Sequence, residues 1–248
     1  MPPIVANLVL PMAITVILIA VYVTLSTIFL KNADEHKKLL PVRIIFYLMI
    51  VFEVAKIVYL IGRDGSFYVN RFPIVFCSMS MFAYPLFCFK QNRFSDLAKG
   101  FSVIPGMLAF VMFAAIQYRY DMSIMQVHSY FYHGAMLAVA IYLLTSKLYK
   151  FEFKKFYGQF LTVGGYIVLA SLVSCLIGGP ISVFAPTDPY LAFLYNVCGF
   201  MPGILIMILA IFVAYFAVYG IIELCQRAHK KKLEKKAMLT TNEAKEAK

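Results

Sequence analysis

The sequence predicts an all-α, polytopic membrane protein. We expect a bundle of about seven transmembrane helices, with the N-terminus outside the cell and the C-terminus in the cytoplasm. Of its 248 residues, 62% are hydrophobic and only 14% are charged, whereas soluble domains carry roughly a quarter charged residues. Uncharged stretches of about 18 to 27 residues separate short charged clusters, and ~20 apolar residues suffice to cross a hydrocarbon core of ~30 Å. The Lys and Arg residues also gather on alternate loops, which indicates a fixed orientation.

The spans are expected in order at residues 4–30, 41–62, 72–90, 101–118, 124–146, 157–178 and 200–224. Residues 1–225 thus form a transmembrane domain. Residues 226–248 form a basic cytoplasmic tail that we expect to be disordered, because charged residues dominate it. The segment 186–224 is too long for one straight span, and the run from Gly199 to Pro202 interrupts it. A short interfacial helix before the last span is therefore expected.

The net charge of +11 follows from this topology rather than from binding to nucleic acid, which we do not expect. Cytoplasmic loops of membrane proteins carry an excess of Lys and Arg. The side predicted to be cytoplasmic receives Lys31, Lys37, Lys38, Arg43, Lys90, Arg93, Lys99, Lys147, Lys150, Lys154, Lys155 and the tail; the other side receives Arg63, Arg71 and Arg119. The expected location is the cell membrane. Membrane lipids are the expected partners, with the basic tail against anionic headgroups, and the oligomeric state is left open.

The cysteines do not indicate a metal or cofactor site. Five cysteines occur, and their spacing matches no metal-binding motif. Cys175 and Cys198 flank an outer loop and either pair or stay free. No cofactor and no metal is expected.

Ionisable and nucleophilic side chains inside the spans share one layer, in the half of the membrane that is predicted to be outer. At a rise of 1.5 Å per residue, they lie roughly 6 to 14 Å below the outer helix ends. These residues are Glu53, Lys56, Cys77, His128 and His133. The inner halves contain nothing comparable. Polar groups are costly in a bilayer, so this layer is the strongest indication of a site.

Helical spacing sorts these side chains into faces. Cys77, Ser80, Tyr84 and Cys88 form one semi-polar stripe that we expect to face the bundle. His133 and His128 are five residues apart and cannot both point to the centre. His133 shares its face with Ser129 and Tyr130, and His128 shares its face with Tyr132.

Each of these residues also has a structural interpretation. Glu53 and Lys56 are i, i+3 neighbours that can neutralise each other. Cys77 can be a small hydrophobe. His133 can hydrogen-bond a neighbouring helix, and His128, near the interface, is expected to be wetted.

Two segments carry a family resemblance. They are Phe-Pro-Ile-Val-Phe-Cys-Ser-Met-Ser at residues 72–80, followed by Pro85, and Tyr-Phe-Tyr-His-Gly at residues 130–134. In these motifs the sequence resembles the YwaF-like family of integral membrane proteins, which includes a vertebrate transmembrane acyltransferase acting on phospholipids. The resemblance implies a cysteine nucleophile at Cys77 and a general base at His133. A lipid ester would then acylate Cys77, and the thioester would pass the acyl group to a lysolipid hydroxyl.

Two departures from the family pattern keep a second hypothesis open. Val75 stands where the family commonly has a histidine, and Ser174 stands where an asparagine is expected. The alternative is a non-catalytic seven-helix module that binds a small amphiphile, or a receptor or accessory subunit. On either hypothesis Glu53, Lys56, His128, Tyr84 and Tyr130 would line the binding site. A transporter is less favoured because the chain has no halved internal symmetry.

Overall fold

The computed structural model describes residues 3–64, 79–89, 94–116, 124–177 and 192–246. Over these residues it is helical and contains no β-strand. The elements are α1 (Pro3–Phe29), α2 (Glu35–Lys38), α3 (Leu40–Asp64), α4 (Met79–Cys88), α5 (Ser95–Ile116), α6 (Ile124–Thr145), η3 (Phe153–Lys155), α7 (Phe156–Ile177), α8 (Ala192–Cys198) and α9 (Phe200–Glu246). The helices α1, α3, α6, α7 and α9 are long and apolar enough to cross a membrane, and α4 is a shorter apolar helix. The all-α membrane bundle is confirmed, and the count of about seven spans stays a prediction for α4 and α5.

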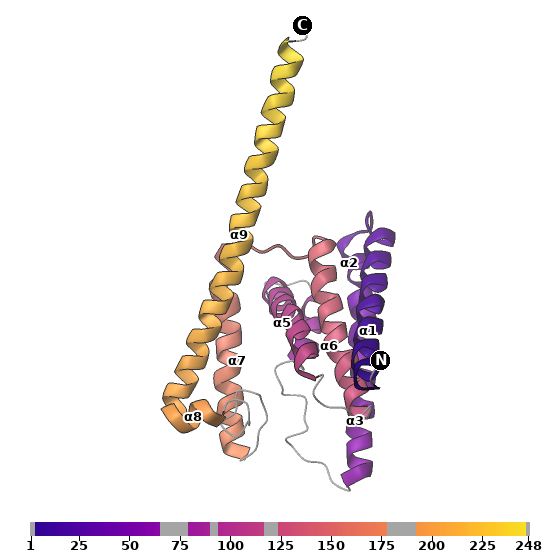
Figure 1. The fold of residues 1–248 in the computed structure, drawn as a ribbon, viewed down its shortest axis with the longest axis vertical. Coiled ribbons are helices and arrows are strands. Elements are labelled where there is room, and N and C mark those ends of the chain that lie inside the picture. Colours follow the sequence, from indigo (N-terminus) through magenta and orange to yellow (C-terminus); the bar gives the residue numbers. More distant parts are fainter. Residues whose placement is uncertain (1–2, 65–78, 90–93, 117–123, 178–191, 247–248) are drawn as a thin grey trace.

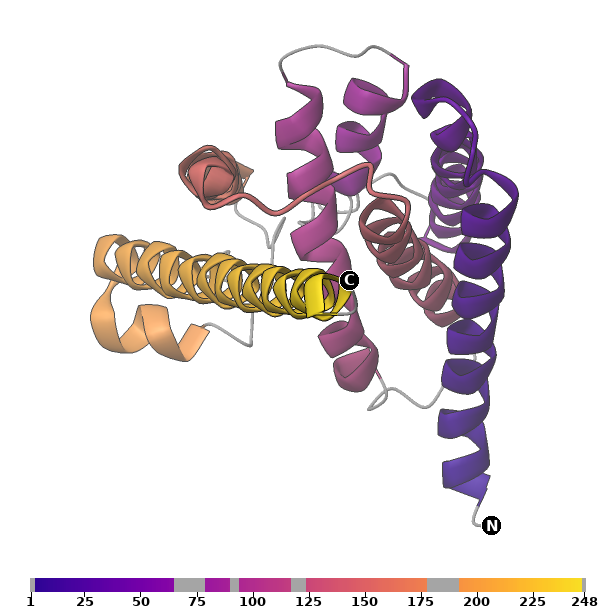
Figure 2. The same cartoon turned by 90° about the horizontal axis from the view of Figure 1, so that it is seen from above.

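Helix α6 is the centre of the N-terminal part of the bundle. It contacts α1, α3 and α5, and Figure 2 shows it enclosed between them. Its closest partner is α5, because Gly106 has no side chain to hold the two backbones apart. A Cβ at Gly106 would lie 2.5 Å from the Met136 carbonyl oxygen and 2.7 Å from the Ala140 Cβ. Small residues at a helix interface let backbones approach in this way.

Helices α7 and α9 form a second group, which joins the rest mainly through the contact of α7 with α5. Figure 1 shows α9 standing beside α7, away from α1. Aromatic rings fill the seam between the two helices, including Phe156, Phe160, Phe212 and Phe216. Edge-to-face packing of this kind adds to the energy of simple burial.

The break before the last span is confirmed. The short helix α8 precedes α9, and only Gly199 lies between them. Gly199 has a φ of +82°, which a residue without a Cβ adopts most easily. The sequence predicted the interruption between Gly199 and Pro202, and the structure places it at Gly199.

The tail differs from the sequence expectation. Residues 226–246 continue α9 as helix instead of forming a disordered segment. After Gly220 the chain contains no Gly or Pro, and it is rich in Lys, Glu, Ala and Leu, which are strong helix formers. Glu223 and Arg227 also form an i, i+4 ion pair of 3.0 Å along this stretch.

Segments that the sequence assigns to the cytoplasmic side lie together at one end of the bundle, which we call the basic end (residues 31–43, 94–99 and 146–155). Lys99 of α5 pairs with Glu35 of α2 over 2.8 Å, and the Tyr142 hydroxyl of α6 donates to the Lys38 carbonyl over 2.7 Å. These contacts agree with the common side that the charge pattern predicts. Which side of a membrane it faces stays a prediction of that pattern.

Candidate functional site

Glu53, Lys56 and His128 form a buried ion cluster between α3 and α6. Lys56 Nζ donates to Glu53 Oε1, and His128 Nε2 donates to Glu53 Oε2 over 3.1 Å. Glu53 is only 3% exposed, so its carboxylate interacts with these two groups rather than with solvent. The predicted i, i+3 pair is therefore present, and His128 joins it from the neighbouring helix.

The expectation that His128 would be wetted is wrong. Its side chain is 12% exposed, and its ring stacks on Tyr132 with centroids 5.3 Å apart. The shared face with Tyr132 was predicted, but the approach of α3 was not. The carboxylate of Glu53 draws the imidazole inward because it offers a charge-assisted hydrogen bond.

His133 is buried on another face of α6. Its Nδ1 donates to the Ser129 carbonyl over 2.8 Å, and the Ser129 hydroxyl lies 3.3 Å from the same nitrogen. Since a carbonyl only accepts, Nδ1 carries the proton, and in the neutral ring the lone pair is on Nε2. Tyr130 is also buried. Packing between α3 and α6 continues beside this site, where Phe52 stacks on Phe131 with centroids 4.0 Å apart.

The semi-polar stripe of α4 faces the bundle, as predicted, in its three described members. Ser80 and Tyr84 are fully buried, and Cys88 is nearly so. Tyr84 also packs edge-on against Phe87. The fourth member, Cys77, lies outside the described residues, so its relation to His133 stays a prediction.

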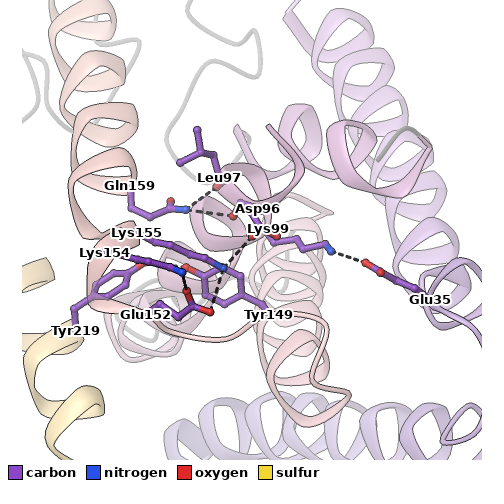
Figure 3. Close-up of polar contacts among 10 residues, drawn as sticks. All are labelled: Glu35, Asp96, Leu97, Lys99, Tyr149, Glu152, Lys154, Lys155, Gln159 and Tyr219. Carbon is purple, nitrogen blue, oxygen red and sulfur yellow. Dashed lines mark hydrogen bonds and ion pairs between the residues drawn. The ribbon is translucent and has the colours of Figure 1, made fainter. Parts of the chain in front are cut away.

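A second polar cluster, which sequence reasoning missed, lies at the basic end (Figure 3). Lys99 and Gln159 are both buried there. Gln159 Nε2 of α7 donates to the Leu97 carbonyl over 3.0 Å. Gly100 makes room for this contact, because a Cβ there would lie 2.1 Å from Gln159 Nε2. A glutamine inside a hydrophobic run was the available signal.

Ion pairs and a tyrosine pair complete this second cluster. Lys155 Nζ lies 2.9 Å from Asp96 Oδ2. The hydroxyls of Tyr149 and Tyr219 lie 2.8 Å apart, which ties the loop after α6 to α9. Burial raises the pKa of the Tyr149 phenol well above its usual range, so this hydroxyl stays protonated. The cluster fastens α2, α5, α7 and α9 to one another.

The cysteines and the acidic side chains form no metal centre in the part of the chain that the structure describes. Cys198 is a free thiol, which favours the unpaired alternative for Cys175 and Cys198. Cys88 and Cys225 are also free.

Comparison with known proteins identifies a family. A sequence model described as the TMEM164 family matches residues 5–219, a range that contains both the Glu53 cluster and His133. This supports a membrane protein family, while the YwaF-like name is not confirmed. No curated protein and no solved structure matches the chain.

Proposed function

The chain belongs to the TMEM164 family of membrane proteins, and from that premise we propose that it transfers acyl groups between lipids inside the bilayer. Cys77 is the proposed nucleophile and His133 the proposed general base. The proposal extends the resemblance of residues 72–80 and 130–134 to a family with a phospholipid acyltransferase.

One observation carries the proposal, namely the hydrogen bonding of His133. The bond from Nδ1 to the Ser129 carbonyl fixes the tautomer and the orientation of a buried imidazole. A general base needs its lone pair on the opposite nitrogen, Nε2, and this tautomer provides it. A backbone carbonyl thus has the orienting role that a third group has in cysteine and serine hydrolases.

The chemistry balances with these two side chains. Cys77 gives its thiol proton to His133 Nε2 as its sulfur attacks the ester carbonyl of a donor lipid. The tetrahedral adduct collapses, the lysolipid alkoxide leaves with the proton from His133, and a thioester remains on Cys77. An acceptor lysolipid hydroxyl then gives its proton to His133 and attacks the thioester. Collapse releases the new ester, and the thiolate recovers the proton.

The neighbouring polar residues are proposed to hold the substrate. Glu53, Lys56 and His128 place charge inside the spans, at the estimated depth where glycerol esters meet acyl chains. Tyr84 and Tyr130 are buried on the adjacent helices α4 and α6, and their hydroxyls would orient the ester.

A second candidate is a non-catalytic module that binds a small amphiphile, and one observation favours it. Glu53 already accepts from both Lys56 and His128, so the cluster needs no substrate to balance its charges. In that case the cluster holds α3 to α6, and His133 would contact the bound amphiphile.

The two candidates separate on the fate of Cys77. We would incubate the full-length protein in vesicles of ester-linked phospholipid and search by mass spectrometry for a hydroxylamine-sensitive acyl adduct. The acyltransferase predicts an adduct on Cys77, and we expect His133→Gln to lower its rate of formation by about 10²–10⁴-fold. Cys88→Ser is the matched control, because it removes the other cysteine of the same stripe.

Adducts that form on Cys88 or Cys225 and never on Cys77 would reject the acyltransferase. The binding module would gain support if Cys77→Ala and His133→Gln both fold, leave the lipids unchanged, and lose stabilisation by added lysolipid.

A further inference from the structure

Arg43, at the basic end, has more hydrogen-bond donors than its contacts within the structure use. It lies near the first turn of α3, and its Nε and Nη2 donate to the Cys88 carbonyl over 2.9 and 2.7 Å. Its guanidinium also sits over the Phe89 ring, 5.7 Å from the centroid. A guanidinium carries five N–H donors, so the two bonds to Cys88 leave three for another acceptor.

Among the residues that the structure describes, no carboxylate matches the positive charge of Arg43. The two nearby acids are already engaged: Glu35 pairs with Lys99 over 2.8 Å, and Asp34 accepts from the Lys37 backbone N–H over 2.8 Å. Within the described ranges, no carboxylate lies within ion-pair distance of Arg43. The site therefore keeps one partly buried cation that favours an anion.

A cavity of about 420 Å³ opens beside this cation. Buried Leu39 and Phe87 provide an apolar floor, while Arg43 and the exposed acids Asp34 and Glu35 line its polar side. Its volume lies within the ~300–1,000 Å³ range of small-molecule sites. The cavity thus offers the Arg43 guanidinium on its polar side and an apolar base.

A lipid-facing stripe of α3 starts at the level of Arg43. Leu40, Ile44, Tyr47 and Leu48 recur at helical spacing, and all four are exposed. In a bilayer this stripe meets acyl chains. Arg43 lies near the end of the span, where the phosphate groups of lipids lie.

We propose that Arg43 binds the phosphate of a phospholipid, with the headgroup in this cavity and the acyl chains along the exposed face of α3. A planar guanidinium matches phosphate with two parallel hydrogen bonds, which distinguishes it from a lysine. Glu53 lies ten positions after Arg43, about 15 Å along the helix, so this site is separate from the proposed catalytic layer.

Arginine footprinting on the full-length protein tests the assignment. The purified protein would be held in a maltoside detergent, which has no phosphate, and treated with phenylglyoxal. The probe is a dialkyl-ether phosphatidylcholine, which has the phosphate but no acyl group to donate, so acyl transfer cannot contribute. We expect the probe to protect Arg43 from modification and a galactolipid to give no protection. Arg63, at the other end of α3, is the internal control.

A binding measurement with the same probe complements the footprint. We expect Arg43→Gln to weaken binding by about 10- to 100-fold, as loss of a charged hydrogen-bonding group predicts, and Arg63→Gln to leave it unchanged. Arg43→Lys should fall between them, since it keeps the charge and loses the fork.

Equal modification of Arg43 with and without the ether lipid would overturn the proposal, whether or not the variants fold. Protection by the galactolipid would overturn the role of phosphate. Protection by inorganic phosphate as strong as that by the lipid would assign the site to a soluble anion and overturn the lipid assignment.

Discussion

The two polar clusters of this protein use similar side chains in different surroundings. In the spans, the single carboxylate of Glu53 faces both Lys56 and His128 and is almost fully buried. At the basic end, Lys99 and Lys155 each have their own acid, and those acids, Glu35 and Asp96, are 48% and 58% exposed. The carboxylates of the two clusters thus differ in their access to water.

Access to water determines how much each ion pair contributes to the free energy of unfolding. A charge in the hydrocarbon region that loses its partner has no solvent to replace it, so breaking a buried pair is far more costly than breaking an exposed one. At the membrane boundary, water or a headgroup takes the place of the missing partner, and exposed pairs contribute ~0–1 kcal/mol. The Glu53 cluster is thus a fixed element, whereas the pair of Lys155 with Asp96 at the basic end can exchange its partner for water.

The largest expected effect comes from neutralising Glu53. Glu53→Gln leaves Lys56 buried without a counter-charge, and we expect a loss of about 3–5 kcal/mol in the free energy of unfolding. Asp96→Asn is the matched control and should cost at most ~1 kcal/mol, because its partner Lys155 is partly exposed and keeps Glu152 as a second acid 4.0 Å away. Denaturant unfolding in micelles measures both, and equal losses would contradict the comparison.

The next effect tests whether packing, rather than charge, holds the basic end. Gly100→Ala puts a Cβ 2.1 Å from Gln159 Nε2 and 2.6 Å from the Tyr149 hydroxyl, so we expect a loss of about 1–3 kcal/mol in unfolding free energy. Gly164→Ala is the control because no atom lies within 4 Å of a Cβ there.

The double variant of Gly100→Ala and Gln159→Ala should lose less than the sum of the two single changes, because the shorter side chain removes part of the clash. Strict additivity of the two changes would mean that Gln159 does not press on α5.

A smaller effect is expected from the tyrosine pair. Tyr149→Phe and Tyr219→Phe each remove one side of a 2.8 Å hydrogen bond, which contributes about 1 kcal/mol. In a double-mutant cycle of unfolding free energies, the second change should cost less than it does alone. A coupling energy of zero would show that the two hydroxyls act independently.

The smallest effect concerns Glu152, a half-buried acid at the basic end. A hydrogen bond from Lys154, helped by the charge of Lys155, holds the pKa of the Glu152 carboxyl below its usual range. Its stabilising contribution is therefore present above the ordinary carboxyl pKa and is lost as the pH falls through the lowered value. We expect Glu152→Gln to flatten the decline of melting temperature below about pH 4.5. Unchanged curves would exclude this contribution.

Local sequence rules predicted much of the fold. The break at Gly199, the inward stripe of α4 and the pairing of Glu53 with Lys56 all follow from spacing and backbone preference. Contacts between helices were harder to predict, because the spacing of residues within one helix does not determine which helices are neighbours. The reach of His128 to Glu53 depends on α3 lying against α6.

The burial of Lys99 was missed because the predicted start of its helix lay too far along the chain. The sequence placed it in a loop before a helix at 101–118, whereas α5 begins at Ser95. Lys99 therefore lies in the second turn of the helix and points at Glu35. For the candidate site, the sequence singled out His133, whose imidazole is buried, and its proposed partner Cys77 lies outside the described residues.

The continuity of α9 has a mechanical consequence. With 47 residues at 1.5 Å each, the helix is about 70 Å long, more than twice the hydrocarbon thickness of ~30 Å. If residues 200–224 cross the bilayer as predicted, the lysine-rich end of α9 extends beyond the membrane as a rod and would reach the headgroups only by bending or leaning. A helix of this length would act as a lever, since a small tilt of its membrane-spanning part would displace the far end by a large distance.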